Sequence, residues 1–388
     1  MHKETLLVPG PTPVLPEIFE ALGQETMGHT DPRFVEIFKR SIENTKKLFQ
    51  TDGEVYIVAG SGTVAMEMAI INTVAQGERL LIISHGYFGD RFTPLAKAYG
   101  IEIDVLQAEW GQQVTSGEVE AMLQKHAYKA VTITHADTST GVSSDLEILV
   151  PLIKKYHALV IVDGVVATAA LQEDMSKQYG ENPNAKIDVV LTGSQKAIGI
   201  PPGLAIVAFS QTALAAQKAI THIPSYYMNI DNWRAVMDNP GLYFATPPVN
   251  LIYAYDQALQ IVLEEGMVKR EARHIAYGKG VRAALMSYGM KPLANEGVAA
   301  PTLSCLFYPE GIEDTAFRKA LAEKGIVVAG ALAQLAGKAF RIGHMGNTTA
   351  QQLEHAIIQI GEVLQQLGTS VNIEQAVTIW QEHVQVIV

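Results

Sequence analysis

The sequence predicts an α/β fold with a mainly parallel sheet, joined to a smaller α+β unit. Between about residues 50 and 210, short β-rich runs alternate with helical patterns. That alternation gives a mainly parallel sheet covered by helices on both faces. After Pro248 the pattern changes to long helical stretches and then to mixed strands and helices. We therefore expect a large domain over residues 14–260. A small domain over residues 261–388 would also take in residues 1–13.

Seven apolar runs are expected to form the strands of the large sheet, because each is short and rich in β-branched residues. Helical patterns lie between them over residues 63–74, 116–126 and 146–157. Ligands of such sheets bind at the carboxyl ends of the strands, so the motifs that follow strands are the first site candidates. The seven runs are EVYIVAG, RLLIISHG, IEIDVLQ, AVTITHAD, ALVIVDG, DVVLTGS and LAIVAFS.

The second part of the chain begins with one long helical pattern, NLIYAYDQALQIVLEEG, which continues through KREARHIAYGKGVRAALMSYG. We expect this pattern to carry the chain out of the large domain. The runs LSCLFYP, IVVAGA and FRIGHMG predict strands of the small domain, and residues 349–367 predict an amphipathic helix.

Composition restricts the class of protein. The chain has 388 residues, 48% of them apolar, so it can bury a sizeable core. A net charge of −11 disfavours nucleic acid and anionic membrane surfaces as partners. A single cysteine, Cys305, forms no internal disulfide and is expected to be a small buried residue. Because no signal peptide or membrane-length apolar run is visible, we expect a soluble cytoplasmic protein.

The motif AGSGTVAMEMA joins a predicted strand to a predicted helix through Ser61, Gly62 and Thr63. Glycines let the backbone approach an anion closely, and a helix N-terminus offers free N–H groups. The motif therefore predicts a phosphate-binding turn, although such a turn also serves simply as a helix entry. It is neither a P-loop, which needs a Lys-Ser/Thr pair, nor a dinucleotide fingerprint, which needs a further spaced glycine.

Two ionisable residues follow the most apolar strands. Asp163 ends ALVIVDG, where a carboxylate is costly to bury unless a positive group meets it. It either caps a turn or partners a cationic cofactor atom. Lys196 lies in the tight apolar loop of VVLTGSQKAIGIPPG. Because burial lowers the pKa of a lysine and frees its amine, we interpret Lys196 as a nucleophile rather than a surface lysine.

An arginine completes the set of candidates. Arg341, in AFRIGHMG, lies among apolar residues and needs a carboxylate or phosphate partner, a structural ion pair being the alternative. A phosphate-binding turn, a partner for a cation, a reactive lysine and a carboxylate-binding arginine are together what a pyridoxal-phosphate enzyme acting on amino acids requires. His135 and His344 lie in neighbouring motifs, but we expect them to be packing residues. Nothing in the sequence has the ligand spacing of a metal site.

The motifs AGSGTVAMEMA, THADTSTG, GSQKAIGIPPG and FRIGHMG, in this order and spacing, resemble those of the fold-type-I, class-V aminotransferases. Within that class the chain is similar to the alanine–glyoxylate and serine–glyoxylate/pyruvate aminotransferases. The resemblance runs from LLVPGPTPV to RIGHMG, which is most of the chain. It implies pyridoxal 5′-phosphate as cofactor and transfer of an amino group from alanine or serine to glyoxylate or pyruvate.

The resemblance also implies roles for particular residues. By resemblance, Tyr243 and Thr246 would reach the phosphate of the neighbouring subunit, and their loop has no evident partner within its own subunit. A homodimer with shared sites follows. Within one subunit, Ser61, Gly62, Thr63 and Gln195 would hold the phosphate, Phe88 and Val165 would contact the pyridine ring, Thr138 would lie near the phenolic oxygen, Asp163 would partner the ring nitrogen, Lys196 would carry the cofactor, and Arg341 would bind the substrate carboxylate.

Three stretches depart from the family pattern. Gly164-Val165-Val166-Ala167 follows Asp163 where the family has a small residue, a valine and then hydroxyl residues. Residues 172–186 look longer than the family pattern, and GHTDPRF (residues 28–34) replaces a segment that usually contains His and Arg. These departures bear on the substrate rather than on the cofactor.

Other functions stay open at this point. RIGHMG and the aspartate of HADTSTG are also similar to pyridoxamine–pyruvate aminotransferase. A lyase or cysteine desulfurase of the same fold is a further alternative, but a desulfurase needs a thiol on a mobile loop and Cys305 lies in a predicted strand. A non-catalytic cofactor-binding protein would not need Arg341. A nicotinamide dehydrogenase would need the fingerprint that the sequence lacks.

Overall fold

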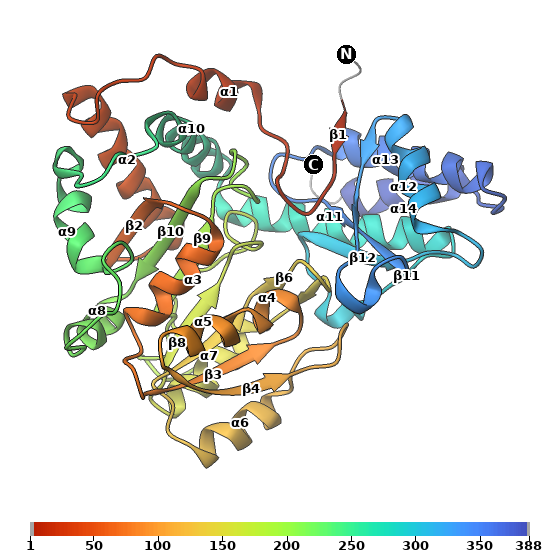
Figure 1. The fold of residues 1–388 in the computed structure, drawn as a ribbon. Coiled ribbons are helices and arrows are strands. Elements are labelled where there is room, and N and C mark those ends of the chain that lie inside the picture. Colours follow the sequence, from red (N-terminus) through yellow and green to blue (C-terminus); the bar gives the residue numbers. More distant parts are fainter. Residues whose placement is uncertain (1–3, 386–388) are drawn as a thin grey trace.

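A computed structural model describes residues 4–385 and confirms the α/β fold (Figure 1). Its large sheet has the strand order β2-β10-β9-β8-β5-β3-β4. Each of the seven predicted runs contributes one of these strands. Neighbouring strands are parallel, except that β10 runs antiparallel to both β2 and β9. The strands are β2 (Glu54–Ala59), β3 (Arg79–Ser84), β4 (Glu102–Gln107), β5 (Ala130–Thr134), β8 (Leu159–Asp163), β9 (Val189–Gly193) and β10 (Leu204–Phe209).

The central strands of this sheet are buried along their whole length, which explains why their sequences are continuous apolar runs. The three predicted helices between strands are present as α3, α6 and α7. The helices up to the end of the large sheet region are α1 (Pro16–Leu22), α2 (Pro32–Phe49), α3 (Gly62–Ile71), α4 (Tyr87–Asp90), α5 (Phe92–Ala98), α6 (Ser116–Lys125), α7 (Leu146–Lys155), α8 (Gln211–Lys218), α9 (Ile230–Asp238), the 3₁₀ turn η1 (Pro240–Leu242) and α10 (Val249–Glu265).

The long helical pattern after Pro248 is two helices rather than one. Helix α10 ends at Glu265, and α11 (Met267–Ser287) begins after Gly266. Gly266 has φ = 79°, a conformation that favours glycine and ends the first helix. The inner residues of α10 join the core of the large sheet, whereas those of α11 join a second core. The domain boundary at residues 260/261 stays a prediction.

The second core lies beneath an antiparallel sheet of order β11-β12-β15-β14. The predicted strand IVVAGA is divided between β13 and β14, and the predicted helix over 349–367 is α13. Strand β1 pairs with β13, so the N-terminal segment lies beside this sheet. No helix within residues 4–385 has the length and apolar content needed to cross a membrane. The elements are β1 (Thr5–Leu6), β11 (Lys291–Pro292), β12 (Leu303–Phe307), α12 (Asp314–Glu323), β13 (Ile326–Val327), β14 (Ala329–Gly330), β15 (Ala339–Gly343), α13 (Ala350–Gln366) and α14 (Ile373–Val384); two short strands, β6 (Ala136–Asp137) and β7 (Val142–Ser143), form a separate hairpin, and η2 (Glu296–Val298) and η3 (Ala333–Leu335) are 3₁₀ turns.

Candidate active site

A cavity of about 240 Å³ lies at the carboxyl ends of the parallel strands, where ligands of open α/β sheets bind. Nine of the twelve site residues expected from the sequence line it, and they come from the segments that follow β2, β3, β5, β8 and β9. The nine are Ser61, Gly62, Thr63, Phe88, Thr138, Asp163, Val165, Gln195 and Lys196.

One wall of the cavity is the N-terminus of α3. Ser61 is the extended N-cap residue of this helix, and no side chain caps its first turn. The first N–H groups of a helix have no partner within the helix, so this end favours an anion. Gly62 packs closely here: a Cβ on it would lie 3.0 Å from a methyl group of Val165, which would have to shift.

Asp163 lies at the end of β8 and is 4% exposed. Its Oδ1 accepts the N–H of Val165 at 3.0 Å, and Asp163 has no ion-pair partner among residues 4–385. Burial raises the pKa of Asp163 to about 7, more strongly than the Val165 hydrogen bond lowers it. A cation beside this carboxylate would reverse the effect of burial, so the environment of Asp163 favours a positively charged partner.

Lys196 is held against the N-terminal loop. Its Nζ donates to the carbonyl of Pro9, and a Cβ on Gly10 would lie 2.5 Å from that Nζ. Gly10 also has φ = 99°, so only glycine fits readily at this approach. Burial, with the positive charge of Arg341 in second place, lowers the pKa of Lys196 to about 8. An amine with this pKa is partly neutral near neutral pH and therefore nucleophilic.

Arg341 does not line the cavity itself but contacts a residue that does. It lies on β15, and its Nη1 donates to the carbonyl oxygen of Thr138 at 3.1 Å. Its Nε donates to the carbonyl of Gly330 at 2.9 Å. Arg341 forms no ion pair with any described residue, and burial lowers its pKa. The structural ion pair considered from the sequence is therefore not found among residues 4–385, and the guanidinium keeps donors for a ligand.

Tyr243 and Thr246 lie outside the cavity of their own chain. The expectation that their loop lacks a partner within the subunit is wrong for Tyr243. This residue is buried, and its ring centroid lies 5.1 Å from that of Trp233 and 6.3 Å from that of Phe38. Thr246 is exposed.

Several residues that contribute to the cavity were missed from the sequence. Arg91 lines it, as do Met66, Ala136 and Val166. The signal for Arg91 is its spacing: it follows Phe88 by three residues, and side chains spaced in this way share a helix face. Asp137, the aspartate of HADTSTG, was assigned no role from the sequence. Its carboxylate accepts the N–H of Phe88 at 3.0 Å and that of Gly89 at 3.1 Å, which fixes the backbone that presents the Phe88 ring.

The small residue that follows Asp163 is closely packed. A Cβ on Gly164 would lie 2.5 Å from the carboxylate of Glu173, which belongs to the longer segment 172–186. Glu173 is buried and bonds to Nδ1 of His135 at 2.8 Å. Oγ1 of Thr168 would lie nearer still to that Cβ, at 2.4 Å, so the space after Asp163 fits only glycine. His344 likewise bonds to Ser304 at 3.0 Å, and neither histidine lines the cavity.

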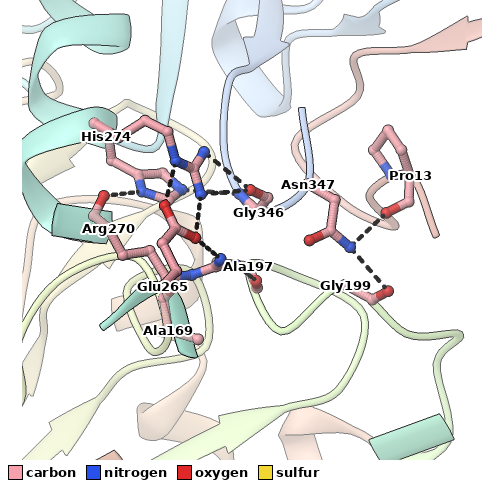
Figure 2. Close-up of polar contacts among 10 residues, drawn as sticks. Pro13, Ala169, Ala197, Gly199, Glu265, Arg270, His274, Gly346 and Asn347 are labelled. Atoms are coloured by element: carbon pink, nitrogen blue, oxygen red, sulfur yellow. Dashed lines mark hydrogen bonds and ion pairs between the residues drawn. The ribbon is translucent and has the colours of Figure 1, made fainter. Parts of the chain in front are cut away.

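Two arginines of α11, Arg270 and Arg273, donate to main-chain carbonyl groups of the loops that build the site (Figure 2). Arg270 donates to the carbonyl of Ala197 at 2.8 Å and also pairs with Glu265. Arg273 pairs with Glu265 at 2.6 Å and donates to the carbonyl of Gly346 at 3.2 Å. One cluster beside the α10–α11 turn therefore contacts both the loop after Lys196 and the loop after β15.

A lysine, an unpaired aspartate and an uncapped helix N-terminus around one cavity are the groups that a cofactor-dependent transferase of amino groups needs. The family model for class-V aminotransferases matches residues 16–351. The chain belongs to this family, and it is a transaminase with the fold of the type-I pyridoxal-phosphate enzymes.

Individual proteins similar to this chain carry related activities. An uncharacterized aminotransferase of Methanocaldococcus jannaschii is 37% identical, over 98% of this chain and 97% of its own length. Alanine–glyoxylate aminotransferase 1 of Saccharomyces cerevisiae is 33% identical (90% and 94%), and serine–glyoxylate aminotransferase of Arabidopsis thaliana is 30% identical (98% and 96%). Among solved structures, pyridoxamine–pyruvate aminotransferase from Mesorhizobium loti superposes with a TM-score of 0.91 at 25% identity, covering 100% and 98% of the two chains.

Proposed function

We propose that this chain moves the amino group of alanine or serine to glyoxylate or pyruvate, using pyridoxal 5′-phosphate, as a cytoplasmic homodimer. The observation that carries the proposal is the placement of Lys196 and Asp163 on one cavity, the lysine half-buried and the aspartate buried, each without an ion-pair partner among residues 4–385. The alanine–glyoxylate and serine–glyoxylate relatives support the choice of substrates.

The residues fit the proposed cofactor. The uncapped N-terminus of α3 and Gln195 suit its phosphate. Asp163 suits its ring nitrogen, because burial raises the pKa of this carboxyl to about 7 and a cation beside it would favour the ionised form. Phe88 suits the face of the ring, with its backbone fixed by Asp137. When bound, the cofactor supplies an electron sink that makes the Cα–H bond of the amino acid acidic.

The residues of this chain would then do three things. Arg341 would bind the carboxylate of the amino acid through two parallel hydrogen bonds and so orient its Cα. Lys196, with a pKa near 8, would take up and return a proton, because a general base works best with a pKa near the operating pH. Asp163 would stay ionised opposite the cationic ring nitrogen. Pro9 and Gly10, which contact the Lys196 side chain, would limit its movement.

The test of this function uses the purified protein loaded with cofactor. Single amino acids are added without an acceptor, and the absorbance of the bound cofactor reports conversion to its amine form. Alanine or serine should convert it, and glyoxylate or pyruvate should restore it. Conversion by none of the amino acids, or no release of 2-oxo acid, would contradict the proposal. Borohydride reduction followed by peptide mapping should place the label on Lys196 and on no other lysine.

Pyridoxamine belongs in the same panel, because the similar structure with a TM-score of 0.91 is a pyridoxamine–pyruvate aminotransferase. If pyridoxamine reacts and the amino acids do not, that second function replaces the first. The desulfurase alternative is not favoured. Cys305 is 2% exposed on β12, and burial raises the pKa of its thiol to about 12. A protonated thiol inside a sheet is a poor nucleophile.

The dimer part of the proposal rests on the surface around η1. Tyr226, Leu242 and Phe244 are 73%, 59% and 37% exposed, and the rings of Tyr226 and Phe244 lie 5.7 Å apart, so apolar side chains adjoin on this surface. A second copy would cover this patch and receive the loop with Thr246. In a closed two-fold dimer both crossings are equivalent.

Mixing two weakly active variants tests whether the sites are shared. Lys196→Ala subunits are combined with Tyr243→Phe/Thr246→Ala subunits, each weakly active alone. In the mixed dimer, one site would receive an intact lysine and an intact crossing loop, so activity should return. Subunit exchange without any return of activity, or an active enzyme that sediments as a monomer, would contradict the shared-site proposal.

A further inference from the structure

Arg91 is a charged residue of the cavity for which neither the sequence motifs nor the proposed mechanism gives a role. It lies between α4 and α5 and is half-buried. Its guanidinium carbon is 4.7 Å from the ring centroid of Phe88 and 5.5 Å from that of Tyr87. Two aromatic rings therefore hold the guanidinium in place beside the cavity, which lowers the entropy lost when a ligand binds to it.

The donors of Arg91 are largely uncommitted. Its Nη1 donates to Oγ1 of Thr63 at 3.3 Å, and Arg91 forms no ion pair with any carboxylate in the described part of the chain. A guanidinium has five N–H donors, so most of them stay available. The positive charge of Arg91 also acts on Asp163 in the same cavity: it lowers the pKa of that carboxyl, whereas burial raises it. A cation with free donors on a cavity wall is a site for an anion.

The position of Arg91 selects which anion. Thr63 lies in the first turn of α3, and that turn with Ser61 and Gly62 forms the anion-favouring wall. Arg341 contacts the cavity through Thr138 instead, from the opposite domain. We propose that Arg91 binds the phosphate group of the cofactor, supplying the full positive charge that the neutral N–H groups of α3 lack. This inference rests on the proposed function.

The charges of the two anions support the assignment of Arg91 to the phosphate and of Arg341 to the substrate carboxylate. A phosphate monoester carries about −1.5 to −2 charges at neutral pH, which partial charges at a helix end balance only in part. A planar guanidinium bonds two phosphate oxygens at once, which a lysine does not. Arg341 is then left for the single charge of the substrate carboxylate, so each anion of the complex meets its own arginine.

The experiment compares two ligands that differ only in the phosphate. Apoenzyme is titrated with pyridoxal 5′-phosphate and with pyridoxal, and the absorbance of the bound ligand gives each Kd. The proteins are the natural chain, Arg91→Gln, Arg91→Lys and the control Arg79→Gln. Arg79 lies at the opposite end of β3, where it pairs with Asp104 and Glu102, so its loss changes the net charge equally without touching the cavity.

Arg91→Gln should weaken pyridoxal 5′-phosphate by about 10- to 100-fold, the range expected for a hydrogen bond to a charged group, and leave the Kd of pyridoxal unchanged. The Kd of Arg91→Lys for pyridoxal 5′-phosphate should lie between those of the natural chain and Arg91→Gln. Arg79→Gln should bind both ligands like the natural chain. Equal weakening of both ligands would show a structural role and overturn the inference. So would an unchanged Kd for pyridoxal 5′-phosphate, including the case in which Arg91→Gln instead raises the KM of the amino acid.

The two proposals fail in different ways. If the natural chain does not bind pyridoxal 5′-phosphate through Lys196, the proposed function is wrong. If the natural chain binds it and transaminates, but the ratio of the two Kd values is the same in Arg91→Gln, only the role of Arg91 is wrong.

Discussion

Removing the charge of Asp163 should stabilise the cofactor-free protein at alkaline pH, although it should abolish most transamination. Folding raises the pKa of Asp163 from its usual 3.8 to about 7 by burial. Between these values the unfolded chain has lost the proton and the folded chain still holds it. The natural fold therefore loses stability relative to Asp163→Asn as pH rises through this range, and the loss levels off above pH 7.

The magnitude follows from the same values. The difference between 3.8 and about 7 corresponds to about 4 kcal/mol, at about 1.36 kcal/mol for each pH unit. About 2 kcal/mol of this falls between pH 5.5 and 7, within a range where the protein can be handled. The Asn side chain keeps an oxygen for the N–H of Val165, so that hydrogen bond survives the change.

The assay is urea unfolding of the apoenzyme from pH 5.5 to 8.5, with Asp188→Asn as a matched control. Asp188 is also a buried aspartate of the same sheet, but Lys154 lies 2.8 Å from it. Its replacement leaves a buried ammonium without a counter-charge and should cost about 3–5 kcal/mol. The same substitution thus has opposite signs at the two positions. A stability difference between the natural chain and Asp163→Asn that does not change with pH would refute the reasoning.

Three further outcomes are expected. The rate at which apoenzyme captures the cofactor should rise with pH, reach half of its plateau at about pH 8 and level off above that, because the pKa of Lys196 is lowered to about 8. In Arg341→Gln the midpoint should move to higher pH, because a neighbouring positive charge is lost; stopped-flow absorbance measures both. Steady-state kinetics of Arg341→Gln should show a KM for the amino acid raised by about 10- to 100-fold, the effect of losing a charged hydrogen-bonding partner. Gly10→Ala should lose most cofactor binding in an absorbance titration, since the new Cβ would meet Nζ of Lys196 at 2.5 Å; normal binding by this variant would contradict the contact.

The parts of the structure that the sequence predicted are those with a local signal. The central strands of the large sheet are continuous apolar runs because both of their faces are buried. The residues that follow the parallel strands gather at one edge by topology alone. That rule was sufficient to bring Asp163, Lys196 and Thr138 to one cavity.

The parts that were missed depend on contacts distant in sequence or on direction. The sequence of an apolar run does not indicate whether the strand is parallel or antiparallel to its neighbours. It therefore did not reveal that β10 is antiparallel to β2 and β9. Pro9 and Gly10 meet Lys196 across 187 residues, and nothing near either motif indicates this. The burial of Tyr243 depends on Trp233 and Phe38, which come from two different helices. Gly266 did carry a local signal for the end of α10, but the periodic pattern on both sides obscured it.

The arginine cluster of Figure 2, formed by Glu265, Arg270 and Arg273, contacts its loops through their main-chain atoms. Arg270 and Arg273 donate to the carbonyl oxygens of Ala169, Ala197 and Gly346, and every residue type offers such an oxygen. Side chains along those loops can therefore be exchanged, for instance to engineer a different amino donor, without releasing the arginines. Glu265, Arg270 and Arg273, on α10 and α11, instead help to fix the path of the loop that follows the lysine. A library that varies the loops should leave those three untouched.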